Sequence, residues 1–201
     1  MEDLRSDGHA ISFVNLGGGL GVPYRWDLQE PPLPTEYAEI VIALADRLGA
    51  KLLFEPGRVI TGNAGILVTE VIYTKRGEKQ FIIADAGMND LVRPTLYDAY
   101  HDIWPVREEL RGKNMARADV VGPVCETGDF IAKDRAMPEA AAGDLLAIMT
   151  AGAYGAVQAS TYNSRRLVPE VLVRGSDYAV IRPRPSYEDM LKAETLAPWL
   201  V

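Results

Sequence analysis

Apolar and polar positions follow two different patterns along the chain, and the pattern changes near residue 65. Before that point, the run AISFVNL (residues 10–16) and the run KLLF (residues 51–54) are apolar, which is typical of strands buried on both faces. Between them, apolar residues recur at helical spacing, with Thr35 as the expected N-cap and Gly49 as the expected C-cap. The pattern predicts one βαβ unit whose two strands are parallel neighbours.

After residue 65 the pattern is typical of an all-β domain. The runs ILVTEVIYTK and KQFIIADAG predict a hairpin whose loop is built around Gly77. Further expected strands are ADVVGPV, DFIAK, DLLAIMTAG, EVLVRG and DYAVIRP, which Gly, Pro and charged residues separate. We expect these strands to form a β-sandwich or a small β-barrel. Ser186 and Asp189 predict a capping box that opens a short final helix.

Two loops that follow the first two strands predict an anion site. Parallel strands place their C-terminal loops on one face, so GGGLG (residues 17–21) and EPGR (residues 55–58) should lie side by side. Bare backbone there exposes N–H groups to an anion such as a phosphate, and Arg58 can add a charged hydrogen bond. The alternative is that the glycines form only a tight structural turn.

Glu55 does not fit a phosphate alone, because a carboxylate repels an anion. A cationic group should lie between them, and the protonated pyridine nitrogen of pyridoxal 5'-phosphate meets that requirement. The alternative is that Glu55 pairs only with Arg58 or another neighbour.

Charge and composition exclude several classes of partner. The formal net charge of −7 argues against binding to nucleic acid, which favours a basic face. No apolar run reaches the length of a membrane span, and the single cysteine, Cys125, cannot form a disulfide within the chain. His9 and His101 are too few and too isolated for a metal site. We therefore expect a soluble cytoplasmic protein with a small-molecule partner and no metal.

Several motifs together resemble one enzyme family. They are EPGRVITGNAG, DAGMNDLVRPTLYDAYH, GPVCETGDF, GDLLAIMTAGAYG and YNSRRLVPEVLVRG, and in this order they are similar to the C-terminal half of the diaminopimelate decarboxylases. That family belongs to the fold-type III enzymes that use pyridoxal phosphate. The GGG and EPGR motifs are shared with ornithine and arginine decarboxylases, whereas DAGMNDLVRP and LYDAYH are specific to the diaminopimelate branch. The resemblance implies decarboxylation of meso-2,6-diaminopimelate to L-lysine and CO₂, the last step of lysine biosynthesis.

The resemblance also implies roles for single residues. Those expected to bind the cofactor are Gly18, Gly19, Glu55, Pro56, Gly57, Arg58 and Tyr154. Those expected to bind the substrate are Arg58, Arg93, Tyr97, Glu126 and Tyr154. Cys125 would be the proton donor and would reach into the site of the partner subunit in a homodimer. From the residues alone, Cys125 is also typical of a small buried side chain, Tyr154 of packing and Arg93 of a solvated loop charge.

Arg93 and Glu126 have a physical reason for their expected role. The distal end of diaminopimelate carries a carboxylate and an ammonium, so a cation and an anion form a suitable opposed pair. Ornithine lacks a distal carboxylate and would leave Arg93 unpaired. The alternatives that stay open are an ornithine, arginine or carboxynorspermidine decarboxylase, and a catalytically silent chain that binds a full-length relative.

The implied fold is α/β plus all-β, with two domains. Residues 1–64 would form the last βα units of a (β/α)8 barrel, and residues 65–201 a C-terminal β-sandwich or β-barrel domain with a short terminal helix. A complete barrel takes roughly 250 residues. The family's cofactor-binding lysine has no counterpart here, since Lys51 begins a strand at the wrong end. We therefore expect a fragment that does not hold the cofactor covalently and that self-associates through its open sheet edges.

Overall fold

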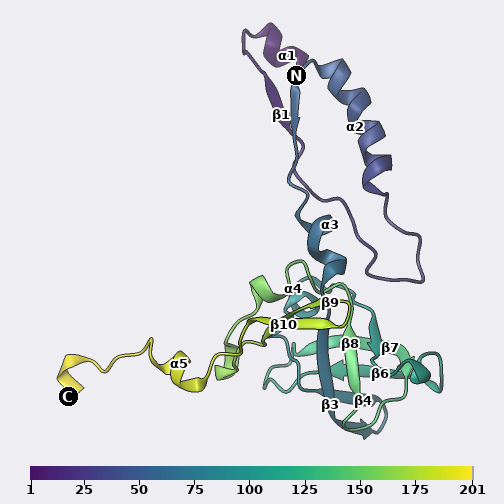
Figure 1. Ribbon diagram of the computed structural model, residues 1–201, viewed down its shortest axis with the longest axis vertical. Helices are drawn as coiled ribbons and strands as arrows, with labels where there is room; N and C mark the ends of the chain where they lie inside the picture. Colours follow the sequence, from purple (N-terminus) through teal and green to yellow (C-terminus); the bar gives the residue numbers. More distant parts are fainter. Residues whose placement is uncertain (201) are drawn as a thin grey trace.

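The N-terminal part of the chain is a βαβ unit. The computed structural model describes residues 1–200. Strand β1 (Phe13–Asn15) pairs in parallel with β2 (Lys51–Leu53), and helix α2 (Pro34–Leu48) connects them beside a short N-terminal helix, α1 (Glu2–Ser6) (Figure 1). The predicted parallel pair is confirmed. Helix α1 was not predicted, and its Arg5 Nη1 donates to the carbonyl oxygen of Leu48 at 2.8 Å.

The ends of α2 test the two predicted caps. Gly49 is the C-cap, as expected, with a left-handed φ of 54° and its N–H donated to Ala45 O at 3.0 Å. The prediction for Thr35 is wrong, because the helix begins at Pro34 and the N-cap is Leu33. A proline suits the first helical position, since its fixed φ is already helical and it has no N–H to satisfy. Glu36 Oε2 accepts from the Leu33 N–H at 2.7 Å and replaces the expected threonine contact.

The expectation that β1 and β2 are buried on both faces is wrong for the chain as described. Phe13 is 60% exposed and Leu53 is 38% exposed. A parallel pair needs a covering layer on each face, and within residues 1–200 the helix that lies alongside the pair is α2 (Figure 1). The contact of α2 with this region includes the Tyr37 ring, which meets the Phe54 ring edge-on at 6.2 Å.

The second part of the chain is a nearly closed six-stranded sheet. Its strands are β3 (Leu67–Arg76), β4 (Gln80–Ala84), β5 (Ile103–Pro105), β6 (Met115–Val121), β7 (Phe130–Pro138) and β8 (Leu145–Ile148), in the order β5-β8-β3-β4-β6-β7. The β3–β4 hairpin around Gly77 is confirmed. Strands β4 and β6 are parallel, and β5 approaches β7 across the gap between the sheet edges. The sequence pattern predicted neither β5 nor the mixed pairing.

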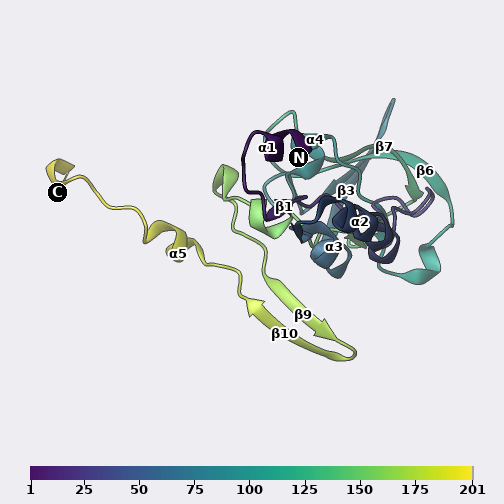
Figure 2. The same ribbon diagram turned by 90° about the horizontal axis from the view of Figure 1, so that it is seen from above.

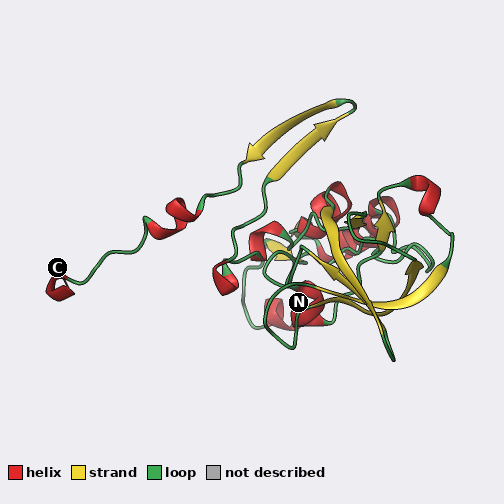
Figure 3. Cartoon of the chain, turned by 90° about the horizontal axis from the view of Figure 1, so that it is seen from below, coloured by secondary structure: helices red, strands yellow, loops and turns green. Residues whose placement is uncertain are grey.

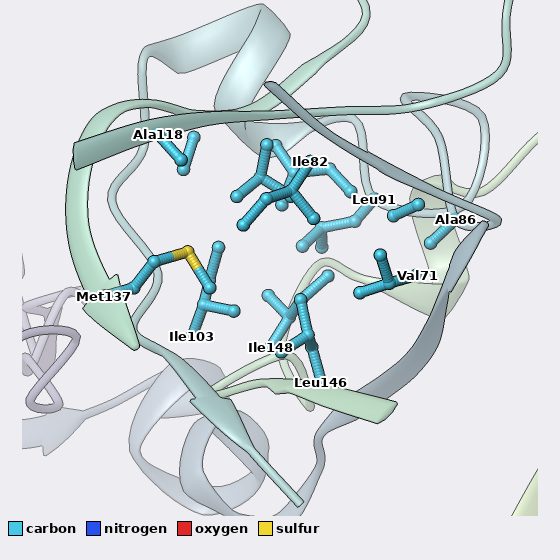
Figure 4. Packing of buried hydrophobic residues seen from close by; sticks show 13 residues of the cluster. Val71, Ile82, Ala86, Leu91, Ile103, Ala118, Met137, Leu146 and Ile148 are labelled. Atoms are coloured by element: carbon cyan, nitrogen blue, oxygen red, sulfur yellow. The ribbon is translucent and has the colours of Figure 1, made fainter. Parts of the chain in front are cut away.

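Apolar side chains fill the inside of this curved sheet. Val71, Ile82 and Ile148 are completely buried, and Leu91 and Leu146 are nearly so. They come from different strands and from the loop after β4, and they point toward one another (Figure 4). Burial of apolar surface on this scale is the main favourable contribution to folding, so the sheet has a core of its own.

Short helical turns connect the strands, and a hairpin projects from the sheet. The turns are α3 (Gly57–Thr61), η1 (Gly62–Ala64), α4 (Arg93–Tyr97), η2 (Glu108–Leu110), η3 (Ala156–Gln158) and η4 (Tyr162–Ser164). The hairpin of β9 (Glu170–Arg174) and β10 (Asp177–Arg182) extends away from the six-stranded sheet, followed by α5 (Tyr187–Leu191) and η5 (Pro198–Leu200) (Figures 2 and 3). The predicted capping box at α5 is confirmed, since Asp189 N donates to Ser186 Oγ at 3.0 Å and Ser186 N donates to Asp189 Oδ2 at 3.1 Å.

Gly152 lies where the sheet meets the segment from α3 to η1. Its N–H donates to Gly62 O at 3.1 Å, and a Cβ atom added to it would lie 1.9 Å from Thr61 O and 2.8 Å from Gly65 N. Both neighbouring atoms are backbone, so two chain segments would have to move apart. We expect Gly152→Ala to lower the free energy of unfolding by about 3 kcal/mol, as measured by urea denaturation.

Gly77 provides the matched control for this substitution. Its added Cβ would meet only Lys79 O, at 4.0 Å, so Gly77→Ala should change stability by less than about 1 kcal/mol. Equal stabilities for the two variants would contradict the close approach at Gly152.

Candidate functional site

The glycine loop after β1 lies against the loop after β2. Glu55 N donates to Gly17 O at 2.8 Å, and a Cβ atom on Gly18 would lie 2.3 Å from Glu55 O. Gly17 and Gly19 have φ angles of 71° and 92°, which side chains rarely tolerate. The predicted adjacency of the two loops is therefore confirmed, and no larger residue fits at Gly18. A Cβ on Gly19 would meet no atom within 4 Å, so this glycine keeps its backbone open on that side.

Asn15 joins the two loops through its side chain. Its Nδ2 donates to Glu55 Oε1 at 2.6 Å, while its Oδ1 accepts from Gly17 N at 2.7 Å. No ion pair joins Glu55 to Arg58 within residues 1–200. A neutral amide therefore orients Glu55 without cancelling its charge, so the carboxylate can still face a cation. Sequence reasoning missed Asn15, although an Asn at a strand end two residues before a glycine run is a known turn signal.

Tyr154 brings the loop after β8 to the EPGR turn. A Cβ atom on Gly57 would lie 3.7 Å from the hydroxyl oxygen of Tyr154, so this hydroxyl lies over the first residue of α3. Pro56 is the N-cap of that helix. Tyr154 itself has a φ of 58°, a left-handed conformation that is uncommon for a bulky residue and often marks a functional site. The cofactor residues expected from the resemblance thus surround one small region.

Arg58 and Arg93 line the same cavity, which has a volume of about 440 Å³. Arg93 begins α4 and is only 8% exposed, so the interpretation of this residue as a solvated loop charge is wrong. Its Nη1 donates to the hydroxyl oxygen of Tyr24 at 2.6 Å. The Nε atom of Arg58 is buried and has no hydrogen-bond partner among residues 1–200. A buried donor without a partner is costly, so the cavity is suited to an anionic ligand.

Cys125 and Glu126 lie on a tight turn between β6 and β7. The buried carboxylate of Asp129 supports this turn, because it accepts from Val124 N at 2.7 Å and from Met88 N at 2.6 Å. Burial raises the pKa of Asp129. Cys125 is exposed, so its interpretation as a small buried side chain is wrong. The described hydrogen bonds do not connect this turn to the glycine loop.

Two hydrogen bonds from the segment after β8 hold the side chains of Glu126 and Tyr97. The Tyr162 hydroxyl donates to Glu126 Oε2 at 3.3 Å, and this hydrogen bond to a carboxylate raises the pKa of Tyr162. Gln158 Nε2 donates to the Tyr97 hydroxyl oxygen at 3.4 Å. Sequence reasoning missed Tyr162 and Gln158, since nothing local in the sequence connects them with α4 or with the turn at Glu126.

Helix α4 also contacts the turn that carries Cys125. Thr95 Oγ1 donates to Gly128 O at 2.7 Å, so the backbone of the turn is attached to the middle of the helix. The same short helix therefore carries Arg93 at its start and Tyr97 at its end, and its middle residue contacts the turn of Cys125 and Glu126.

His101 is completely buried behind this region. Its Nδ1 donates to Met149 O at 2.8 Å, and its Nε2 has no partner among residues 1–200. Burial lowers the pKa of His101 to about 4, with the charges of Arg93 and Arg135 acting in the same direction. The part of the chain that the structure describes has no cluster of three or more His, Cys, Asp or Glu side chains able to hold a metal.

The buried histidine predicts a pH dependence of stability. An unfolded chain protonates His101 below about pH 6.5, whereas the folded chain does so only near pH 4. The unfolded state binds more protons in this window, so stability falls as pH drops from 6.5 to 4, by about 3 kcal/mol in full.

His101→Asn isolates this contribution, since an amide can donate to Met149 O but does not titrate. We expect urea denaturation curves to show a weaker loss of stability for the variant over this pH range. Identical slopes for the two proteins would contradict a neutral buried His101.

Within residues 1–200, no helix is both long and apolar enough to cross a membrane.

Comparisons with known proteins identify the family of this chain. The profile of one family, described as pyridoxal-dependent decarboxylase, C-terminal sheet domain, matches residues 11–152. The chain therefore belongs to the pyridoxal-dependent decarboxylases, and the nearly closed six-stranded sheet is their C-terminal sheet domain.

Individual relatives show which enzymes of this family the chain is similar to. The chain is 50% identical to a diaminopimelate decarboxylase of Zymomonas mobilis, over 98% of this chain and 46% of the relative. It is also similar to the crystal structure of a diaminopimelate decarboxylase from M. jannaschii in complex with L-lysine, with a TM-score of 0.89, 34% identity, and coverage of 99% of this chain and 46% of that one. A lysine/ornithine decarboxylase from Vibrio vulnificus is less similar, with a TM-score of 0.66 and 27% identity over 81% of this chain and 44% of that one. The chain thus spans about half the length of the curated relatives it matches.

Proposed function

We propose that this chain is the C-terminal half of an enzyme that decarboxylates meso-2,6-diaminopimelate to L-lysine and CO₂ with pyridoxal 5'-phosphate as cofactor. The observation that carries the proposal is Arg93, a nearly buried cation that shares a cavity with Arg58 of the EPGR turn. A substrate with a carboxylate at each end accounts for two arginines better than a diamine precursor with one carboxylate. The reaction would be a step of lysine biosynthesis in the cytoplasm.

The residues present fit the cofactor. The backbone of Gly18 and Gly19, which is open at Gly19, would donate N–H groups to the phosphate, and Glu55, oriented by Asn15, would hold the ring nitrogen protonated. Bound pyridoxal phosphate supplies a ring that accepts the electrons released when CO₂ leaves. Arg58 would add charge near the phosphate and reach the substrate. Tyr154 would touch both ligands from above the EPGR turn.

The substrate's distal end would be bound from α4 and the turn after β6. Arg93 would pair with the distal carboxylate, Glu126 with the distal ammonium, and Tyr97 would add a hydroxyl contact. Such a pair discriminates against substrates without a distal carboxylate, because they would leave Arg93 buried without an anion.

Cys125 would supply the proton that replaces the departing CO₂. A thiol is a competent acid for this step, and Cys125 is exposed on its turn, where a second subunit can reach it. We propose a homodimer in which this turn completes the site of the partner subunit. The exposed free thiol is compatible with a reducing compartment.

The two alternative functions have less support. An ornithine, arginine or carboxynorspermidine decarboxylase is disfavoured by the lower similarity to the lysine/ornithine decarboxylase and by the need to leave Arg93 unpaired. A catalytically silent binding partner is favoured only by the lack of a match to the family's cofactor-binding lysine in this sequence, and no described contact adds support for it.

The decisive experiment uses a hybrid enzyme. It joins this chain to the N-terminal part of the Zymomonas mobilis relative that lies outside the match. With pyridoxal phosphate present, we expect release of CO₂ and L-lysine from meso-diaminopimelate and little turnover of ornithine or arginine. Light scattering on the same sample should give the mass of a dimer. A folded, cofactor-loaded hybrid that prefers ornithine would overturn the proposal.

A further inference from the structure

Tyr24 lies in the loop that continues from the glycine run toward α2, and this loop is attached to the six-stranded sheet on both sides of it. Thr150 Oγ1 donates to Pro23 O at 3.1 Å, and Trp26 N donates to Asp102 Oδ2 at 3.0 Å. Asp102 N donates to the carbonyl oxygen of Tyr24 itself at 3.3 Å. The backbone of Tyr24 is therefore fixed relative to the sheet, although the residue belongs to the N-terminal part of the chain.

The side chain of Tyr24 is fixed as well. Its ring meets the ring of His101 edge-on, with centroids 5.2 Å apart and an interplanar angle of 85°. Because His101 is completely buried, its ring has little room to move, and the tyrosine ring packs against it. The hydroxyl group is thus presented from a side chain that has little freedom to move.

Arg93 depends on this tyrosine for its orientation. Besides the hydrogen bond of 2.6 Å between Nη1 and the Tyr24 hydroxyl oxygen, the guanidinium carbon of Arg93 lies 4.7 Å from the centre of the Tyr24 ring. No carboxylate of residues 1–200 forms an ion pair with Arg93. A nearly buried guanidinium is therefore held by a neutral partner, so its charge remains available to an incoming anion.

We infer that Tyr24 is a positioning residue that sets the orientation of Arg93 for the distal carboxylate of the substrate, an inference that rests on the proposed function. A free arginine side chain loses up to about 2 kcal/mol of rotamer freedom when a ligand immobilises it. Tyr24 imposes that order before the ligand binds. An acidic residue at this position would also hold Arg93, but it would compete with the substrate carboxylate.

The position of Tyr24 has a second consequence. The same loop contributes Gly18 and Gly19 to the phosphate site and then Tyr24 to the arginine, so one continuous segment connects the cofactor site to the site that selects the substrate. Arg58 of the EPGR turn lines the same cavity as Tyr24 and Arg93.

The test compares two ligands that differ in one carboxylate. L-lysine retains the distal amino-carboxylate end of diaminopimelate, whereas cadaverine is L-lysine without its carboxylate. The hybrid enzyme is loaded with pyridoxal phosphate for this test. Calorimetry should show that Tyr24→Phe raises the Kd of L-lysine about 10-fold, the loss of affinity expected for one hydrogen bond to a charged group. The Kd of cadaverine should change less than about 2-fold. The KM for diaminopimelate should rise in parallel, with kcat changed by less than about 3-fold.

A measurement of thermal stability and two further variants distinguish a positioning role of Tyr24 from a packing role. Tyr24→Phe keeps the ring against His101, so we expect its Tm to stay within about 3 °C of the parent. In an Arg93→Ala background, Tyr24→Phe should have no additional effect on L-lysine binding. The matched control is Tyr73→Phe, which removes an exposed hydroxyl on β3 and should leave both Kd values unchanged.

The outcomes distinguish this inference from the proposed function. An unchanged Kd for L-lysine in Tyr24→Phe, or an equal loss for L-lysine and cadaverine, overturns the positioning role while diaminopimelate turnover by the parent hybrid still stands. If the parent hybrid does not turn over diaminopimelate and binds cadaverine as tightly as L-lysine, the proposed function fails first, and the role of Tyr24 fails with it.

Discussion

Replacing Arg93 with alanine should lower kcat/KM of the hybrid enzyme for meso-diaminopimelate by about 1,000-fold, which corresponds to about 4 kcal/mol. The physical reason is that the distal carboxylate of the substrate would enter a nearly buried site without the guanidinium that pairs with it. Removing one partner of a buried ion pair costs about 3–5 kcal/mol, because the remaining charge stays desolvated. The Tyr24 hydroxyl also loses its partner, which adds to the effect. Steady-state kinetics with diaminopimelate and ornithine as competing substrates measures the change directly.

Arg76→Ala is the control for this result. Arg76 also pairs through its guanidinium, with Glu139 at 2.6 Å, but both side chains are exposed on the surface. Exposed ion pairs contribute little, so kcat/KM should stay within about 3-fold of the parent. Unchanged diaminopimelate turnover in Arg93→Ala would favour a substrate without a distal carboxylate, such as ornithine.

The second large effect is expected from Glu55→Gln. This substitution removes the negative charge, yet Asn15 Nδ2 can still donate to the side-chain oxygen that replaces Glu55 Oε1, so the geometry of the two loops is preserved. Without the charge, the ring nitrogen of bound pyridoxal phosphate is not held protonated and accepts electrons less well. We expect kcat to fall by about 100-fold or more, while KM for diaminopimelate changes little, because Glu55 is not placed against the substrate.

Two measurements make this prediction specific. The absorbance spectrum of the bound cofactor should change with the protonation of its ring, whereas the midpoint of thermal unfolding should stay close to that of the parent. Glu78→Gln, in the exposed turn between β3 and β4, removes the same charge far from the glycine loop and should leave kcat unchanged. A Glu55→Gln enzyme with full activity would mean that the ring nitrogen does not need this carboxylate.

Local patterns were sufficient for much of the fold. The β3–β4 hairpin and the capping box at Ser186 each depend on residues close together in sequence, and both are confirmed. The parallel pair of β1 and β2 joins more distant residues, but the strand–helix–strand order predicted it, and it is confirmed as well. Errors occurred where two neighbouring residues could both mark the start of a helix. Thr35 was the expected N-cap of α2, but the helix already begins at Pro34. Strand β5 was missed because it has only three residues and charged residues lie close on both sides, whereas the equally short β1 lies in a longer apolar run.

The sequence by itself determined which residue types are available for the chemistry. The glycine run, the EPGR turn and the motifs around Arg93 and Cys125 were sufficient to identify the family and to predict that the first two loops meet, because the C-terminal ends of parallel strands share one edge. The charge of −7 and the single cysteine likewise limited the classes of partner before any fold was known.

Only the tertiary structure decided which side chains act together. Asn15 reaches Glu55 and Tyr24 reaches Arg93 across long stretches of chain, and the burial of Arg93 depends on the loop from the N-terminal part packing against the sheet. Such contacts leave no periodic or compositional trace, since hydrogen-bond partners distant in sequence are brought together by packing and not by local conformation. For this reason Arg93 could be predicted from its sequence motif, whereas its contact with Tyr24 is seen only in the folded structure.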